Sequence, residues 1–139
     1  MADLSTKYLG LELKNPIIVG SSGLTSTVHG ITECADNGAG AVVLKSLFEE
    51  QIIAETREET SAADMGLHPE AYNYVMNTIM ENNIAYYINL LKDAKERVDI
   101  PVIASVNCTS AGAWTEYAKD FENAGADATP RHGAPAGPR

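Results

Sequence analysis

Three short, almost wholly apolar segments constrain the fold of this chain more than any other feature of its sequence. They are Ile17–Val19, Ala41–Leu44 and Val102–Val106, and each is followed by small or polar residues. Continuous apolar runs of this length are typical of strands covered on both faces, as in a parallel sheet packed between helices. Helical patterns separate the three segments, so strands and helices alternate along the chain. The sequence therefore predicts an α/β fold with parallel strands and right-handed crossovers.

A short hairpin and a long helix are expected around these strands. Apolar and polar residues alternate over Leu4–Tyr8 and Leu11–Leu13, on either side of Gly10, which predicts a hairpin with one face in water. A helix is expected over 78–98, where apolar side chains recur at helical spacing. These side chains are Ile84, Tyr87, Ile88, Leu91, Ala94 and Val98. We expect them to face the core.

Two further helices are expected, over 25–37 and after Ser110, and they end in similar sequences. Residues 37–41 read NGAGA and lead into the second apolar strand, whereas residues 123–128 read NAGADA. Glycine just after the last helical residue is a common stop signal. By analogy, another apolar strand should follow the second of these segments.

Residues 129–139 break this pattern. They contain three prolines and two glycines, which do not suit a central strand. We therefore predict that the fourth strand is missing, that residues 1–128 form the folded unit, and that 129–139 are an aberrant or disordered tail. A shifted or prematurely ended reading frame would explain the change of composition, and a natural tail on a small domain is the alternative.

Charge and composition exclude several classes of protein. Lys and Arg total 10 against 19 Asp and Glu, a formal net charge of -9, so no nucleic-acid partner is expected. The sequence has no basic leader and no apolar run of about 18 residues, so we expect a cytoplasmic protein without a membrane span. Cys34 and Cys108 lack the spacing of a zinc site and are expected to be free thiols.

The residues that follow the expected strands are the candidates for ligand binding, because parallel α/β folds bind ligands at the carboxyl ends of their strands. Ser21, Ser22 and Gly23 follow the first strand, and their small side chains would let a flat ring or a phosphate approach the backbone. A tight turn without a ligand is the alternative. Lys45 ends an apolar strand and is expected to meet an anion or a ring nitrogen, unless it simply reaches solvent. Asn107 ends the third strand.

Other reactive side chains favour structural roles. Cys108 has no histidine near it in the sequence, so a buried thiol is expected rather than a nucleophile. His29 and His68 lack the spacing of metal ligands or of a catalytic triad. The acidic segment 49–69 is longer than most loops in compact domains and is a candidate functional loop.

Three blocks of this sequence together resemble the dihydroorotate dehydrogenase family. The blocks are 15–23, 38–46 and 101–107, and the likeness extends from Leu4 to about Ala128. The chain is most similar to soluble, dihydroorotate dehydrogenase-like proteins and to the flavin barrel of dihydropyrimidine dehydrogenases. This resemblance implies a homodimeric TIM (β/α)8 barrel that binds FMN and oxidises dihydroorotate or a related dihydropyrimidine by hydride transfer to the flavin. The chain would form a partial barrel, consisting of the hairpin and about the first three β/α units.

The resemblance also implies roles for individual residues. Those expected beside the flavin are Ser21, Ser22, Gly23, Lys45, Ser46 and Asn107. Those expected beside the substrate are Lys45, Met65, Gly66 and Leu67. Two residues before the methionine the family usually has an asparagine, whereas this chain has Ala63, so a hydrogen bond expected to the pyrimidine is lost. This difference bears on whether the substrate is dihydroorotate itself.

The family's catalytic base, second flavin lysine and phosphate-binding glycines have no counterpart in these 139 residues. The resemblance therefore implies that the chain alone is an inactive, truncated part of an FMN-dependent dehydrogenase, with no catalytic residue of its own. Two alternatives stay open. Lys45 would suit a Schiff-base lyase or aldolase-type barrel, and the chain would otherwise be a short non-catalytic protein.

Overall fold

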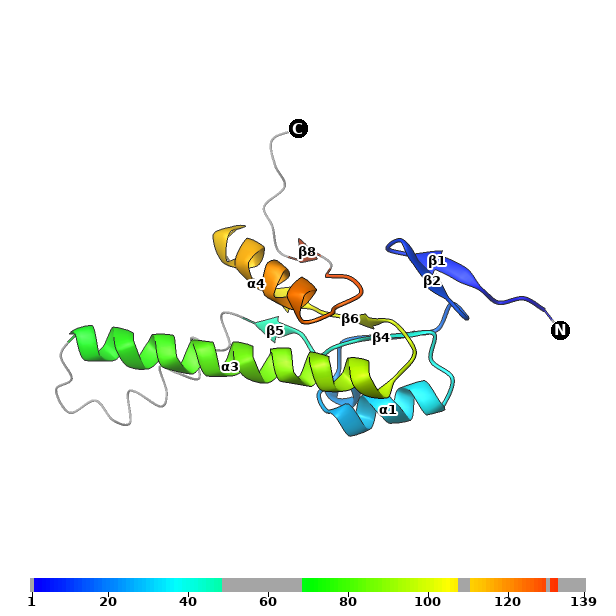
Figure 1. Cartoon of the computed structure of the whole chain (residues 1–139), viewed down its shortest axis with the longest axis horizontal. Coiled ribbons are helices and arrows are strands. Elements are labelled where there is room, and N and C mark those ends of the chain that lie inside the picture. Colours follow the sequence, from blue (N-terminus) through cyan, green and yellow to red (C-terminus); the bar gives the residue numbers. More distant parts are fainter. Residues whose placement is uncertain (1, 49–68, 108–110, 130, 133–139) are drawn as a thin grey trace, which may run out of the picture.

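The computed structural model describes residues 2–48, 69–107, 111–129 and 131–132, in which strands and helices alternate (Figure 1). In chain order the elements are β1 (Thr6–Tyr8), β2 (Leu11–Leu13), β3 (Ile18–Val19), the 3-10 helix η1 (Gly23–Thr25), α1 (Val28–Asp36), β4 (Ala41–Val43), β5 (Leu47–Phe48), α3 (Pro69–Arg97), β6 (Val102–Ile103), β7 (Val106–Asn107), α4 (Ala111–Asn123) and β8 (Arg131–His132). The helices expected over 25–37, over 78–98 and after Ser110 are all present, with shifted ends.

Two parallel sheets are formed by the described strands. In the first, β4 lies between β3 and β6, and Val42 is paired with Val19 on one side and Val102 on the other. In the second, β7 lies between β5 and β8. Every pairing within these two sheets is parallel, which confirms the α/β class expected from the sequence. The barrel stays a prediction, since both sheets are open as far as the chain is described.

The structure divides one strand that the sequence predicts and adds another strand after a second one. Over 102–106 the structure forms β6 and then β7, and the strand predicted over 41–44 is followed at once by β5. The Leu47 N–H donates to the Ser105 carbonyl oxygen at 2.9 Å, beside the pairing of β5 with β7. A run of apolar residues indicates that a segment is buried, and both sheets contain buried residues. The sequence therefore does not show where the chain passes from one sheet to the other.

β3 is an edge strand, and its two faces are covered only in part: Val19 packs on the core under the helices and Ile18 on the cluster around Leu13. Ile17, just before it, is 63% exposed, and Ile18 and Val19 are only partly buried. Among the described residues β4 is its only strand partner. The apolar run thus marks a strand correctly, but the extent of its burial depends on neighbours that the run does not specify.

The predicted hairpin is confirmed as an antiparallel pair of β1 and β2. Its two-residue turn has Leu9 at φ 51° and Gly10 at φ 78°, and such positive angles match the twist of the flanking strands. Leu13 is buried with Ala41 and Ile103, on the face of the first sheet opposite to the helices. The hairpin therefore covers part of that face.

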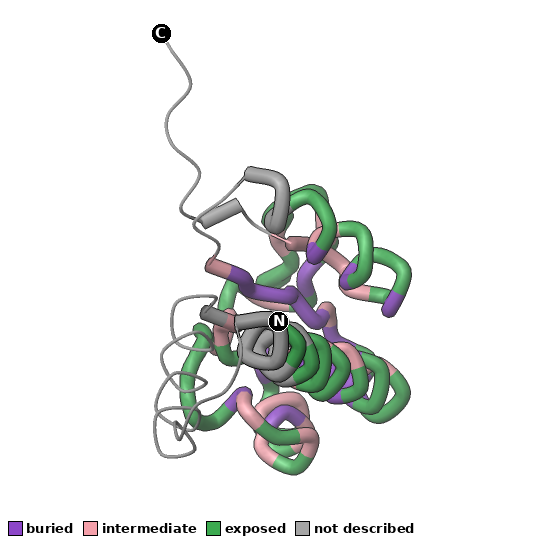
Figure 2. The backbone as a smooth tube through the Cα atoms, turned by 90° about the vertical axis from the view of Figure 1, so that its left-hand side faces the viewer, coloured by how far each residue is buried: buried purple, intermediate pink, exposed green. Residues whose placement is uncertain are grey.

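Helices α1, α3 and α4 lie side by side over the other face of the strands (Figure 2). The stripe predicted on the long helix is confirmed as part of this core. Its buried members are Tyr87, Leu91, Ala94 and Val98, and its partly buried members are Ile84 and Ile88. Tyr87 packs against Phe121 of α4, with ring centroids 4.9 Å apart. Neither α3 nor any other helix of the described residues is long and apolar enough to cross a membrane.

Gly38 and Gly125 end α1 and α4 in the same way, as their similar sequences predict. Both have a φ of 95°, in the left-handed region that glycine adopts without steric cost. The repeated sequence pattern therefore corresponds to a repeated helix-to-strand turn.

The chain continues to pair after this second turn. Ala128 forms a parallel bridge with Ile103, and Arg131–His132 form β8 beside β7. The expectation that no strand follows Ala128 is thus wrong for these residues, because two residues pair through their main chains whatever the proline content around them. Residues 130 and 133–139 of the predicted tail lie outside the described residues.

Asp127 fixes the amino end of β6. Its Oδ2 accepts hydrogen bonds from the Val102 main-chain N–H at 2.8 Å and from Lys95 Nζ at 2.7 Å. The Asp127 N–H in turn donates to the Val102 carbonyl oxygen at 3.1 Å. Val102 is fully buried, so its N–H depends on this carboxylate for a partner.

We predict that Asp127→Ala lowers the free energy of unfolding by about 1–3 kcal/mol, because it leaves the buried Val102 N–H without an acceptor. Lys95→Met removes only a partly exposed ion pair and should cost about 0–1 kcal/mol. Urea unfolding followed by circular dichroism measures both changes. Equal losses in the two variants would show that the ion pair, and not the bond to the main chain, is the stabilising contact.

Candidate functional site

The carboxyl ends of β3, β4 and β6 lie at one edge of the first sheet, because the three strands are parallel neighbours. Ser21, Ser46 and Ser105 follow these ends, one after each strand, and are called the serine row below. Ser46 Oγ lies 3.0 Å from Ser21 Oγ and 2.7 Å from Ser105 Oγ. The Ser46 main-chain N–H also donates to Ser21 Oγ, at 2.7 Å. The serine row is therefore one continuous chain of hydrogen bonds.

The serine row runs from the surface into the core. Ser21 is exposed, Ser46 is partly buried and Ser105 is 3% exposed. At the inner end the Tyr87 hydroxyl accepts a hydrogen bond from the Ser105 N–H at 2.8 Å and donates to the Ser105 carbonyl oxygen at 3.1 Å. Burial raises the pKa of the Tyr87 hydroxyl to about 12, and the hydrogen bond with Ser105 opposes that shift only in part. Tyr87 is therefore neutral at ordinary pH and serves as both donor and acceptor.

Thr25 anchors the loop that carries the outer end of the row. Its side chain is fully buried, and its Oγ1 accepts from the Ser22 N–H and donates to the Ser22 carbonyl oxygen, both at 3.2 Å. The Thr25 carbonyl oxygen accepts a hydrogen bond from the Lys45 N–H at 3.2 Å. These bonds hold the loop after β3 against the residue that follows β4.

The structure brings some of the predicted site residues together. Ser21 and Ser46 contact each other directly. Lys45 is exposed next to Ser46 in the chain, and its side chain has no ion pair with any described residue. Asn107 is partly buried in β7, which belongs to the second sheet. The contacts expected of Lys45 and Asn107 with a ligand stay predictions.

Open space lies beside the loop after β3. Ser22 and Gly23 are exposed, and a Cβ atom added at Gly20 or Gly23 would meet no atom of the described residues within 4 Å, its chain neighbours aside. A flat ring therefore has room to approach this backbone. Of the residues expected beside the substrate, Lys45 is described, whereas Met65, Gly66 and Leu67 lie outside the described residues. Ala63 and Cys108 lie outside them too.

Sequence reasoning missed Ser105 and Tyr87. Ser105 is the single polar residue of Val102–Val106, and a buried hydroxyl needs a hydrogen-bond partner. Tyr87 belongs to the apolar stripe of α3, and a buried tyrosine usually finds a partner for its hydroxyl. Each residue thus carries a signal in the sequence, but only the folded chain shows that the Tyr87 hydroxyl bonds the Ser105 main chain and that the Ser105 hydroxyl bonds Ser46.

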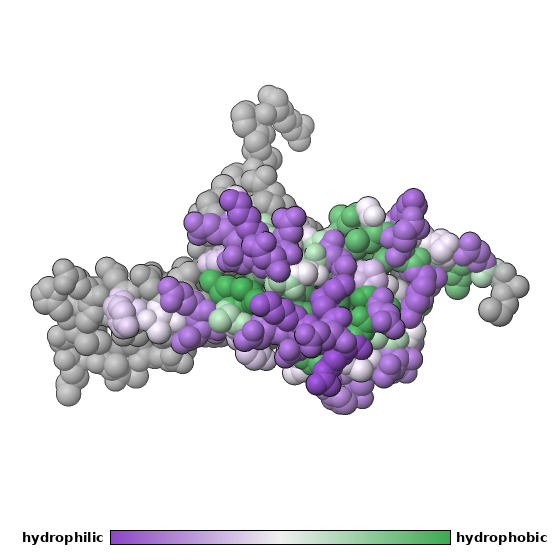
Figure 3. Space-filling model, in the orientation of Figure 1, coloured by the Kyte–Doolittle hydropathy of each residue, from purple (hydrophilic) through white to green (hydrophobic). Residues whose placement is uncertain are grey.

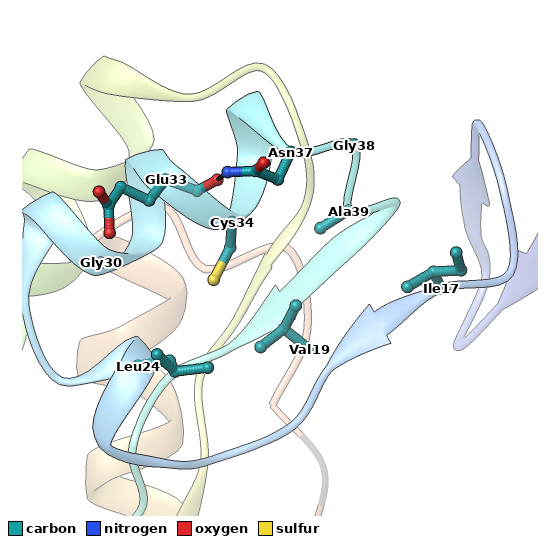
Figure 4. A pocket seen from close by; sticks show the side chains of 9 residues that line it. All are labelled: Ile17, Val19, Leu24, Gly30, Glu33, Cys34, Asn37, Gly38 and Ala39. Atoms are coloured by element: carbon teal, nitrogen blue, oxygen red, sulfur yellow. Dashed lines mark hydrogen bonds between the residues drawn. The ribbon is translucent and has the colours of Figure 1, made fainter.

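A separate pocket of about 330 Å³ lies beside the exposed edge of β3, against α1. Its lining is mostly apolar, and Figure 4 shows the Cys34 sulfur directed towards the gap between Val19 and Leu24. No member of the serine row lines it. Apolar surface also lies over the hairpin tip and between α3 and α4 (Figure 3). These apolar areas suit packing, whereas the polar chemistry gathers at the serine row.

Tyr87→Phe is predicted to lower the free energy of unfolding by about 1–3 kcal/mol, since the buried Ser105 N–H loses its acceptor while the ring packing is kept. Urea unfolding at pH 7 measures the loss. Tyr86→Phe, at a position of the same helix that is 63% exposed, is the matched control. It should change stability by less than about 0.5 kcal/mol. A Tyr87→Phe variant as stable as the wild type would contradict a role for the buried hydroxyl.

The raised pKa of Tyr87 also predicts a pH dependence of stability. Below its ordinary pKa of 10.0 the hydroxyl is protonated in both the folded and the unfolded chain, and its contribution is complete. Between about pH 10 and pH 12 the unfolded chain loses this proton first, so stability falls as pH rises, by up to about 1.4 kcal/mol per pH unit. This decline in stability should be smaller in Tyr87→Phe. Equal declines in the free energy of unfolding of the two proteins between about pH 10 and pH 12 would contradict the prediction.

Comparison with known proteins finds relatives, although no family model matches the sequence. The relatives from Thermoplasma acidophilum and Thermoplasma volcanium are each named dihydroorotate dehydrogenase B (NAD(+)), catalytic subunit. They are 29% and 31% identical to this chain over 130 and 135 residues, which cover 92% of the chain and 40% of each relative. A protein of the same name from Methanosarcina mazei is 31% identical over 122 residues, 86% of the chain and 36% of the relative. The chain thus spans about 40% of the length of the curated relatives that it matches.

Proposed function

This chain is a relative of the dihydroorotate dehydrogenases, and we propose that a protein containing it oxidises dihydroorotate or a related dihydropyrimidine with bound FMN. The observation that carries the proposal is the similarity of 92% of the chain to catalytic subunits of that name. The serine row supports it, because a polar cluster at the carboxyl ends of parallel strands is where such folds bind ligands.

The described residues suit a flat ring that carries carbonyl oxygens. The open space beside Gly20 and Gly23 leaves room for the ring, while Ser21 and Lys45 are exposed donors at the same edge. When bound, FMN would supply the acceptor for a hydride from the dihydropyrimidine. Lys45 would hold its positive charge near the ring and stabilise negative charge that develops there.

We place the remaining parts of the site outside these 139 residues. The relatives are more than twice as long as the segment matched, so other polypeptide is available for a proton-abstracting base and for a phosphate site. The described residues then orient the ligands and do not remove the proton. A Schiff-base role for Lys45 is not favoured, because its side chain is exposed, whereas that chemistry uses a desolvated lysine.

Titration of the ¹⁵N-labelled chain with FMN, followed by NMR, tests the proposal residue by residue. The amide signals of Ser21, Ser22, Gly23 and Lys45 should shift, and those of the β1–β2 hairpin should not. Lys45→Met should weaken binding about tenfold, since a charge-assisted contact is lost. Lys92→Met, which removes an exposed lysine from α3, is the matched control and should leave binding unchanged.

Either of two results would overturn the proposal. One is a folded protein, extended to the length of the relatives, whose strand-end amides do not respond to a large excess of FMN. The other is borohydride trapping of a carbonyl substrate on Lys45, which would indicate imine chemistry, because a flavin-dependent oxidation leaves no imine to trap.

A further inference from the structure

We propose that the hydrogen bonds of the serine row run in one fixed direction, which makes Ser21 a donor to an oxygen atom of the ligand. The ligand class is a flat ring that carries a carbonyl or carboxylate oxygen. Ser105 and Tyr87 are positioning residues, which set this direction from the core. The ligand part rests on the function proposed above, whereas the direction follows from the hydrogen bonds of the chain itself.

The buried end of the serine row decides the direction. Ser105 is 3% exposed, so its hydroxyl hydrogen needs an acceptor inside the protein. Ser46 Oγ, at 2.7 Å, is the one hydrogen-bond partner of Ser105 Oγ among the described residues. If Ser46 donated to Ser105, the buried Ser105 hydrogen would have no acceptor among the described residues. Ser105 therefore donates to Ser46.

The same reasoning carries the direction to the surface. Ser46 gives its own hydrogen to Ser21 Oγ, 3.0 Å away, and its main-chain N–H donates to the same oxygen at 2.7 Å. A serine hydroxyl has two lone pairs and one hydrogen. Both acceptor positions of Ser21 are thus filled from within the protein, and only its hydrogen is left. Since Ser21 is exposed, it offers that hydrogen to a ligand.

Lys45 gives the same edge a second donor. An ammonium group has three hydrogens to donate and no lone pair to accept with. The bond from the Lys45 N–H to Thr25 holds the lysine backbone against the loop that carries Ser21. Two groups that only donate favour ligand oxygens and disfavour ligand N–H groups at this edge.

Tyr87 fixes the inner end of the serine row. Its hydroxyl is bonded to both the N–H and the carbonyl of Ser105, and its ring is packed against Phe121. The Ser105 backbone is therefore held in place, and its Oγ stays within reach of Ser46. In this way Tyr87 of α3 fixes the direction in which Ser21 donates at the surface, without contacting the ligand.

The direction can be measured on the chain without any ligand. We expect NMR to detect the hydroxyl protons of Ser105 and Ser46 as slowly exchanging signals, with the Ser105 proton close to the Cβ protons of Ser46. The Ser21 hydroxyl proton should exchange rapidly with water. A protected Ser21 proton that lies close to Ser46, together with a Ser46 proton close to Ser105, would reverse the direction and overturn the proposal.

Variants test whether Ser21 donates to a ligand oxygen. FMN and orotate are titrated separately, because both have flat rings with oxygen atoms and either could contact Ser21. Ser21→Ala should weaken binding of the probe that contacts Ser21 about threefold to tenfold, and Ser21→Thr should restore most of it. Ser105→Ala should weaken the same probe although it removes no ligand contact. Ser5→Ala, at an exposed serine ahead of β1, is the control and should have no effect. Tyr87→Phe should act in the same direction as Ser105→Ala.

The outcomes separate this proposal from the function on which it rests. Loss of binding in Ser21→Ala with unchanged binding in both Ser105→Ala and Tyr87→Phe would overturn the positioning roles. Should Ser105→Ala fail to fold, Ser105→Cys replaces it, because a thiol is a weaker donor of similar size. If neither probe shifts any amide of the wild type extended to the length of the relatives, the proposed function fails, and the hydroxyl exchange pattern alone decides the direction.

Discussion

Parallel pairing of β4 with β3 and with β6 is the interaction on which the rest of the structure depends. Main-chain hydrogen bonds such as that from the Val42 N–H to the Pro101 carbonyl oxygen, at 3.0 Å, hold this register. A slip of one residue would turn the apolar side chains of a strand to its opposite face and separate the serines at the strand ends. Both the helix-covered core and the serine row therefore require the same alignment of three short strands.

The two ends of the first sheet carry different tasks. At the amino end of β6, Asp127 accepts a hydrogen bond from the Val102 N–H and forms an ion pair with Lys95. These contacts stabilise the fold. At the carboxyl ends, hydroxyl groups and an exposed lysine gather, which is the side that serves ligands in parallel α/β folds. Tyr87 connects the two ends, because its ring belongs to the core and its hydroxyl bonds the main chain of Ser105.

The edge of β3 contrasts with the filled layer between strands and helices. Ile17 and Leu24 are each 63% exposed there, next to the apolar pocket against α1. The main-chain N–H and C=O groups of an open strand edge can pair with a further strand. Closure of a sheet into a barrel would pair this edge, so the exposed edge agrees with the barrel expected from the family and with the greater length of the relatives.

The sequence by itself determined the α/β class, the hairpin, the buried stripe of α3 and the two glycine helix ends, because periodicity and backbone freedom are properties of neighbouring residues. It also pointed to Ser21 and Ser46, since each is the second residue after an apolar segment. Only the tertiary structure decided that Ser105 completes the row and that Tyr87 bonds its main chain. The same holds for the position of β3 at an edge and for the pairing of β8 after Ala128. Hydrogen-bond partners and covered faces are supplied by atoms far apart in the chain, and no local pattern encodes which of them meet.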